Sequence, residues 1–214
     1  MYCDDKGGKS RMRCLMCEKR KEESDHFFDY FYEKDPLCYE CRKKWIRCKK
    51  KRKMDTHLIH SSWIYNEAYA ECLIQYKECF DEALQDVFLF PVKNTLKRKY
   101  WNRTVILLPS SNEKIEKRGF HHLEKMYSSL GLPMINPFIK KENVDQKGKG
   151  SKGREEIQNV ILLKENISFP KRVLIVDDVM TTGCTLRACL RWIPKECDIQ
   201  IYVNSMSVKE YELP

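Results

Sequence analysis

The sequence predicts an α/β fold, in which helices flank a parallel sheet and a small cysteine-rich module precedes them. Short aliphatic runs alternate with helical patterns in the second half of the chain, which is the order that builds parallel sheets. By contrast, two Cys-x₂-Cys pairs fall near the amino terminus. We therefore expect a cysteine module at 1–48, a basic linker at 49–60 and an α/β domain at 61–214.

Local patterns predict the individual elements. Apolar residues at three- to four-residue spacing predict helix over 66–90, which Asp81 divides into two in one interpretation. The aliphatic runs are at most four residues long, whereas a membrane-spanning helix needs about 20, so no membrane segment is expected. Buried strands are predicted at 105–108, 160–163, 173–176 and 198–203, and further helices at 120–130 and 185–193.

The formal net charge of +9 has a local origin. Residues 42–53 hold nine Lys and Arg and no acid, and the remaining chain carries 31 basic and 31 acidic residues. One interpretation is a patch that binds a polyanion such as nucleic acid. The other is a solvated linker, because blocks of like charge are often disordered.

Eleven cysteines with no apolar leader before them indicate a reducing cytoplasm, where clustered cysteines favour metal binding over disulfides. The two Cys-x₂-Cys pairs are separated by 20 residues, which is the spacing of a structural zinc site. Such a site helps a segment with little apolar core to fold. The predicted ligands are Cys14, Cys17, Cys38 and Cys41. Alternative ligands are Cys3, His26, Cys48 and the pair His57 and His60.

The strongest chemical signal is the stretch VLIVDDVMTTGCT at 173–185. A buried strand leads to two carboxylates, Asp177 and Asp178, and ligands of open parallel sheets bind beyond the carboxyl ends of strands. The loop that follows offers backbone N–H groups and hydroxyls to a phosphate at a helix N-terminus. The carboxylates accept hydrogen bonds from ribose hydroxyls or support magnesium. The expected loop residues are Met180, Thr181, Thr182, Gly183, Cys184 and Thr185. An acidic turn at a sheet end is the alternative.

This stretch resembles the phosphoribosyl pyrophosphate (PRPP) signature of type I phosphoribosyltransferases. Nearly the whole chain is similar to the ComF family of competence-associated proteins. The resemblance also rests on the four cysteines, on Tyr65 and Tyr69 before LIQYK (73–77), on VILLPSS (105–111) and KRGFH (117–121), and on Gln146, Arg154 and Asn159. Met180, Cys184 and His121 depart from the usual family residues. The resemblance implies a type I phosphoribosyltransferase-like domain with a zinc-binding head, partners in the competence machinery and a role in DNA uptake.

By the same resemblance, the loop after strand 105–108 is the pyrophosphate loop. Ser110 and Ser111 hold the diphosphate and Arg118 adds a fixed positive charge, although a surface arginine is the alternative. Residues 140–154 are either a lid over pyrophosphate or an ordinary disordered loop. In a transfer reaction, Asp177 and Asp178 are the catalytic candidates. Magnesium and the basic groups stabilise the pyrophosphate that leaves the sugar.

Three functions remain open from the sequence. The first is a competence factor that binds PRPP or a phosphosugar and also single-stranded DNA. Its DNA contacts are Lys49, Lys50, Lys51, Arg52 and Lys53, with Trp45 stacking on bases and Trp63 and Tyr65 nearby. In the alternative, Trp45 packs on the zinc head. The second function is an active phosphoribosyltransferase of nucleotide metabolism, for which no acceptor base is evident. The third is an interaction adaptor with a vestigial ligand site.

Overall fold

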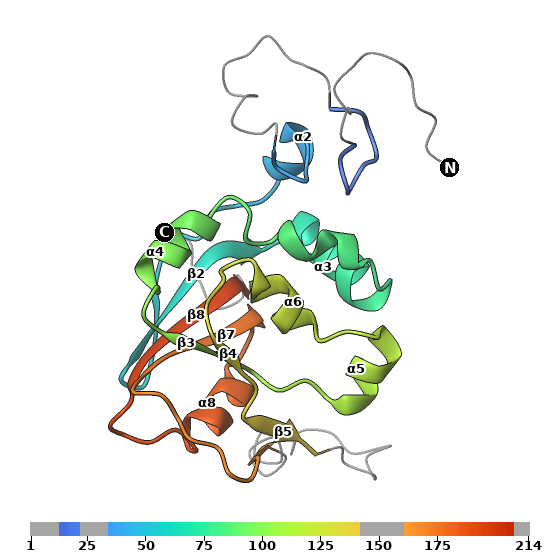
Figure 1. Ribbon diagram of the computed structural model, residues 1–214. Coiled ribbons are helices and arrows are strands. Elements are labelled where there is room, and N and C mark those ends of the chain that lie inside the picture. The colour runs from blue at the N-terminus through green and yellow to red at the C-terminus, as the bar shows by residue number, and fades with distance from the viewer. Residues whose placement is uncertain (1–12, 22–33, 142–160, 208–214) are drawn as a thin grey trace.

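The computed structural model describes residues 13–21, 34–141 and 161–207. Within these residues a six-stranded sheet forms the centre of the molecule, with strand order β1-β2-β8-β7-β3-β4 (Figure 1). All neighbouring strands are parallel except β1 and β2, which form an antiparallel hairpin. The strands are β1 Arg52–Met54, β2 His57–Tyr65, β3 Thr104–Leu107, β4 Met134–Ile135, β7 Arg172–Met180 and β8 Asp198–Ser207. The prediction of a mostly parallel α/β fold is confirmed.

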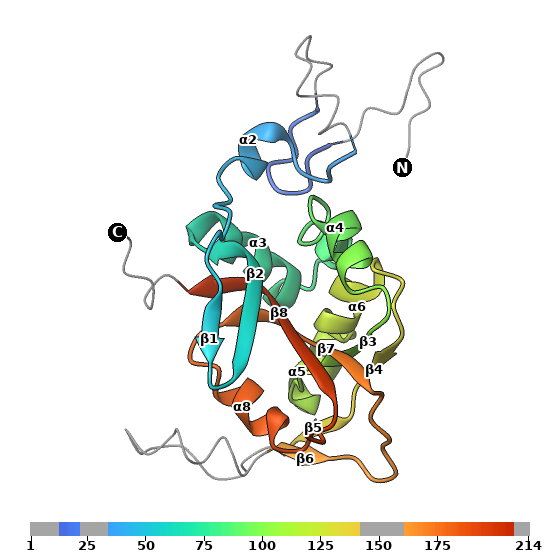
Figure 2. The same cartoon turned by 90° about the vertical axis from the view of Figure 1, so that its left-hand side faces the viewer.

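Helices cover both faces of this sheet. In Figure 2, α8 lies away from α3, α4 and α6, on the other side of the central strands. The helices are α2 Tyr39–Arg42, α3 Glu67–Glu78, the 3-10 helix η1 Glu82–Asp86, α4 Lys93–Lys99, α5 Asn112–Arg118, α6 His122–Ser128 and α8 Cys184–Leu190. The aliphatic residues Val173–Val176 of β7 are fully buried between these layers, as the continuous apolar run predicts.

The expected helix over 66–90 is divided, as one interpretation of Asp81 proposed. Asn66 caps the start of α3 by accepting a hydrogen bond from the backbone N–H of Tyr69. Phe80 adopts a left-handed conformation, with φ of 61°, and so interrupts the helix. Asp81 then caps η1 by accepting from the N–H of Ala83. The turn places the two helical pieces against each other.

Two other expectations about strands need correction. The run expected to end at residue 176 continues as β7 to Met180, because β8 offers a parallel partner as far as Met206. The strand expected at 160–163 does not join the main sheet. Its residues Ile161–Leu163 form β6, which pairs antiparallel with β5 (Phe138–Lys140). Neither pairing can be read from the local apolar pattern alone.

The segment expected as a linker over 49–60 instead contributes β1 and the first residues of β2 to the central sheet. Ile59 of β2 is fully buried and lies beside Ile201 of β8. The lysines around β1 remain exposed, so the basic charge lies on the surface of a sheet edge.

A buried cation joins the cysteine-rich head to the body. The Arg42 guanidinium forms an ion pair with Asp35 and donates to the carbonyl oxygen of Val87. It also lies over the ring of Trp45, at 4.6 Å from the centroid. Trp45 is only 5% exposed and packs against aromatic rings of the body, Trp63, Tyr69 and Phe88. The head is therefore docked on the domain through buried contacts.

Among the described residues, no helix has the length and apolar character needed to cross a membrane.

Candidate functional site

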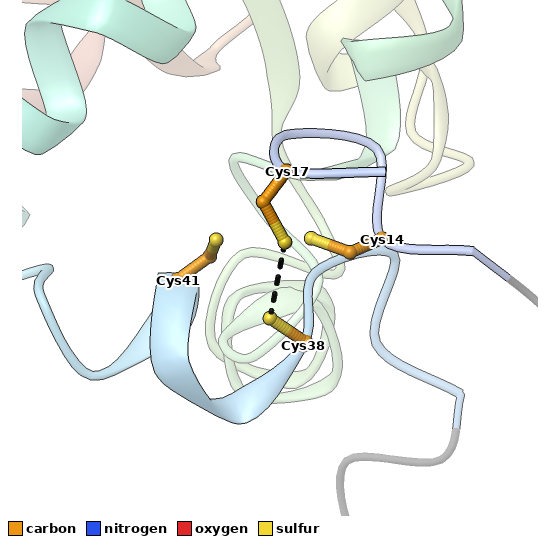
Figure 3. A group of neighbouring side chains, drawn as sticks. All are labelled: Cys14, Cys17, Cys38 and Cys41. Atoms are coloured by element: carbon orange, nitrogen blue, oxygen red, sulfur yellow. Dashed lines mark hydrogen bonds between the residues drawn. The ribbon is translucent and has the colours of Figure 1, made fainter. Parts of the chain in front are cut away.

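Four cysteine sulfurs converge in the head, from a tight turn at 14–17 and from the start of α2 (Figure 3). The N–H of Leu15 donates to the carbonyl oxygen of Pro36, which ties the turn to the segment that leads into α2. All four ligand atoms lie within 4.8 Å of one another, and the sulfurs of Cys17 and Cys38 are 3.7 Å apart. Tetrahedral zinc with thiolates at about 2.3 Å places sulfurs about 3.8 Å apart. The cluster therefore fits zinc, as the sequence spacing predicts.

The two acidic residues near the end of β7 have different environments. Asp178 is 6% exposed and its side chain contacts α3 and α6. Its Oδ2 accepts from the Lys77 ammonium at 2.5 Å and lies 3.0 Å from Nε2 of His122. Its Oδ1 accepts from the backbone N–H of Val179. Both carboxylate oxygens of Asp178 are thus engaged by the protein.

The contacts of His122 assign the tautomer of its ring. Arg118 is a permanent donor, and its Nη1 lies 3.0 Å from Nδ1 of His122, so Nδ1 must accept. Nε2 then carries the proton that is donated to Asp178. Burial lowers the pKa of His122, although Asp178 has the opposite effect. The net lowering keeps the ring neutral. Ser110 Oγ lies 3.5 Å from the same Nδ1. The network therefore reaches the predicted pyrophosphate loop.

Burial opposes ionisation of Asp178, but the charge of Lys77 and the hydrogen bond from His122 together outweigh it. The pKa of Asp178 consequently lies below its ordinary value. Burial and the adjacent negative charge of Asp178 raise the pKa of Asp177. Asp177 is half-buried, and its Oδ1 accepts from the backbone N–H of Asp178. Of the two carboxylates, Asp177 has fewer side-chain partners. Its side chain could therefore contact a cation or the hydrogen-bond donors of a ligand.

The loop after β7 has a backbone conformation that requires glycine. Gly183 has φ of 74°, and a Cβ there would lie 2.8 Å from Cε of Met180 and 3.0 Å from Sδ of Met54. Thr181 and Thr182 are exposed, while Met180 is buried. α8 begins at Cys184 and has only seven residues, so the loop N–H groups and hydroxyls offer more to an anion here than a helix dipole does. Thr185 lies in the first turn of α8.

The predicted pyrophosphate loop follows β3, the strand next to β7 in the sheet. Ser110 and Ser111 are half-buried, and Ser111 forms a parallel bridge with Lys140. This bridge places the start of the predicted 140–154 lid beside the loop, while residues 142–154 lie outside the described residues. Arg118 is 6% exposed and donates to the Lys77 carbonyl oxygen, so the alternative of a surface arginine is wrong. Gln146, Arg154 and Asn159 also lie outside the described residues.

The predicted nucleic-acid residues are distributed differently from the expectation. Lys49, Lys50, Lys51 and Lys53 are exposed. Arg52 is half-buried, and its Nη1 donates to the carbonyl oxygen of Thr181, in the candidate phosphate loop. Trp45 and Trp63 are buried, at 5% and 2% exposure, so no base can stack on either ring. Trp45 packs against Trp63, Tyr69 and Phe88 of the body, and so not on the head alone as the alternative expected.

Sequence reasoning did not assign roles to Lys77 and His122. A signal for Lys77 existed, because it lies four residues after Leu73, on the same helix face as the buried residues Tyr69, Leu73 and Tyr76. A lysine on an apolar face needs a buried partner. For His122 the sequence holds no comparable signal, since the adjacent pair His121 and His122 does not show which ring is buried.

Known proteins show similarity over the same region. Residues 98–201 match the profile of the phosphoribosyl transferase domain family. The Competence protein ComFC of Streptococcus pneumoniae is 28% identical over 122 residues, which cover 57% of this chain and 55% of that protein. The Competence protein ComFC of Bacillus subtilis is 24% identical over 215 aligned positions, with 86% of this chain and 90% of that protein covered.

Two solved structures with weak similarity to this chain are the following. One is the hypoxanthine phosphoribosyltransferase of Trypanosoma cruzi, with a TM-score of 0.36 and 16% identity over 68% of this chain and 73% of that one. Another is the adenine phosphoribosyltransferase of Leishmania tarentolae, with a TM-score of 0.36 and 12% identity over 74% and 94%.

The sheet order, the acidic strand end and the domain match together define a phosphoribosyltransferase-like protein. The two ComFC relatives and the four-cysteine head support the expected resemblance to the ComF family.

The metal site yields a direct prediction. The full-length protein should bind one zinc ion, and Cys38→Ser should lose most of it, because three thiolates leave the tetrahedron incomplete. Cys79→Ser is the matched control, since Cys79 is exposed and lies outside the cluster. Zinc content measured by plasma mass spectrometry tests this. Equal zinc in the two variants would contradict the assignment.

Proposed function

We propose that the protein binds PRPP or a related phosphoribosyl ligand, and also single-stranded DNA, as a factor in DNA uptake during transformation. The observation that carries the ligand proposal is the pairing of Asp177 with the Gly183 loop. A half-buried carboxylate, of raised pKa, lies just before a loop of exposed hydroxyls and backbone N–H groups. The carboxylate suits a ribose diol, and the loop suits the 5-phosphate.

Within this proposal the two acids have separate roles. Asp177 accepts from ribose hydroxyls or supports magnesium that arrives with the diphosphate. Asp178 pairs with Lys77 and His122 and so fixes α3 and α6 against β7. Ser110 and Ser111 face the diphosphate from the end of β3. Arg118 contributes positive charge from behind them, since its guanidinium is buried against His122.

Magnesium is the cofactor that this chemistry implies, because carboxylate and phosphate oxygens are its preferred ligands. Asp177 would be the side chain that supports it. When bound, the ion supplies positive charge to the diphosphate. The proposal places the protein in the cytoplasm, where reduced thiols remain available to zinc.

An active phosphoribosyltransferase is the second candidate, and the domain match over residues 98–201 favours it. The reaction would break the bond between C1 of the ribose and pyrophosphate and form a bond to an acceptor nitrogen. The described residues do not reveal an acceptor pocket. Pyrophosphate release from PRPP, measured with a panel of nucleobases, separates a transferase from a binding protein.

We expect PRPP with magnesium to raise the melting temperature of the wild-type protein, because a ligand that binds only the native state stabilises it. At 100 times the dissociation constant the gain is about 2.7 kcal/mol. Asp177→Asn should lose most of this shift while keeping the unliganded melting temperature. Glu71→Gln, an exposed position on α3, is the control with the same loss of charge. Absence of any shift in the wild type would remove the ligand proposal.

For nucleic acid, we expect the affinity for labelled oligothymidylate to fall steeply with salt, because basic side chains displace counterions from phosphates. Replacing Lys49, Lys50 and Lys51 by Gln should reduce the slope of log affinity against log salt by about 2. Arg52 is left intact, since it contacts the phosphate loop. Replacement of the exposed Lys114, Lys117 and Lys195 is the matched control. An unchanged slope in the first variant would contradict DNA binding by this segment.

A further inference from the structure

A second group of basic residues, distant in sequence, lies against the basic segment. We define the α4 surface as Lys51, His60, Lys97, Arg98, Lys99 and Trp101. Lys99 Nζ lies 3.3 Å from Nδ1 of His60, which joins the end of α4 to the middle of β2. The chain through 47–54 runs antiparallel along β2, with Arg52 opposite Ile59, and so places Lys51 next to His60.

Electrostatics shows that these groups converge. Burial, followed by the charges of Lys99 and Lys51, lowers the pKa of His60 to about 4. Burial and the charge of Lys51 lower the pKa of Lys99. His60 is therefore neutral near pH 7 and accepts a hydrogen bond from Lys99. Among the described residues, Lys51, Lys97 and Lys99 form no ion pair with an acid.

Trp101 is the most exposed of the large apolar side chains in the described part of the chain, at 71%. It follows Lys99 by two residues and precedes β3, at the amino-terminal edge of the sheet. An indole exposed to water buries little apolar area, so Trp101 contributes little to the stability of the fold. The same combination is what single-stranded nucleic acids require, namely a stacking ring within a positively charged path.

We propose that the α4 surface binds single-stranded nucleic acid, with Trp101 stacking on an unpaired base and Lys51, Lys97 and Lys99 contacting phosphates. This inference rests on the proposed DNA-binding function and gives it a location that the sequence did not. It replaces Trp45, which is buried. A duplex fits less well, because its bases are already stacked on one another.

The position also separates the two ligands. The candidate phosphoribosyl loops follow the carboxyl ends of β3 and β7, whereas Trp101 lies before the amino end of β3. Both strands are parallel in the sheet, so Trp101 and these loops lie at opposite ends of the strands. The single-stranded nucleic acid and the phosphoribosyl ligand can therefore bind the same molecule at once. Arg52 of the basic segment donates to the Thr181 carbonyl oxygen in the candidate phosphate loop.

The test uses the full-length protein with fluorescein-labelled oligothymidylate. Trp101→Ala should weaken binding about five- to one-hundred-fold, because stacking of one base is lost. Trp101→Phe should restore part of it, since a smaller aromatic ring still stacks. Intrinsic tryptophan fluorescence should be quenched by the oligonucleotide in the wild type and much less in Trp101→Phe. Lys99→Gln should weaken binding more than Lys114→Gln, which removes the same charge from α5.

The outcomes distinguish this inference from the broader proposal. If the wild type binds oligothymidylate and Trp101→Ala binds equally well, the location is wrong but DNA binding stands. If the wild type does not bind it, both are wrong. Equal binding of a duplex of the same length would overturn the stacking role. The melting-temperature shift with PRPP should be unchanged in Trp101→Ala, which confirms that the variant is folded, and its loss would contradict separate sites.

Discussion

The buried carboxylate of Asp178 is the constraint on which the candidate site depends. An ionised carboxylate that is 6% exposed is tolerated only when it is paired and hydrogen-bonded. Lys77 from α3 and His122 from α6 provide these contacts, and Arg118 at the end of α5 then completes the contacts of His122. Three helices are thereby fixed against β7 by one charge. Removal of either partner would leave a buried charge less compensated, which typically costs several kcal/mol.

Much of the framework was predictable from the sequence, because it depends on local patterns. The two Cys-x₂-Cys pairs predict the four-cysteine cluster, and the aliphatic run before Asp177 predicts a buried strand. What could not be predicted depends on partners distant in the chain. The 49–60 segment reads as polar and basic, yet Met54 and Ile59 within it are buried by contacts with loops and strands more than 100 residues away. Likewise, the different roles of two adjacent aspartates follow from strand alternation together with the positions of α3 and α6.

The structure gives the net charge of +9 a definite arrangement. Part of the basic segment, Arg42, is buried in an ion pair that docks the head, and another part, Arg52, contacts the candidate phosphate loop. The exposed lysines then adjoin those of α4. The basic residues form one block in the sequence, but in the structure some dock the head, one contacts the loop after β7 and the others are exposed. A zinc ion at the four-cysteine cluster would stabilise the head, and Trp45 packs the head against Tyr69 and Phe88 of the body.

The state of the His122 ring tests the central claim most directly, because the ring contacts Asp178 on one side and Arg118 on the other. Nitrogen-15 shifts of the ring, assigned by comparison with His122→Gln, report both the tautomer and the pKa. We predict a proton on Nε2 and a pKa below the ordinary value of about 6.5. The pKa should rise in Lys77→Met, since the charge of Lys77 lowers it, and should be unchanged in Lys93→Met. A ring that titrates near 6.5 in the wild type, or that carries its proton on Nδ1, would contradict the account.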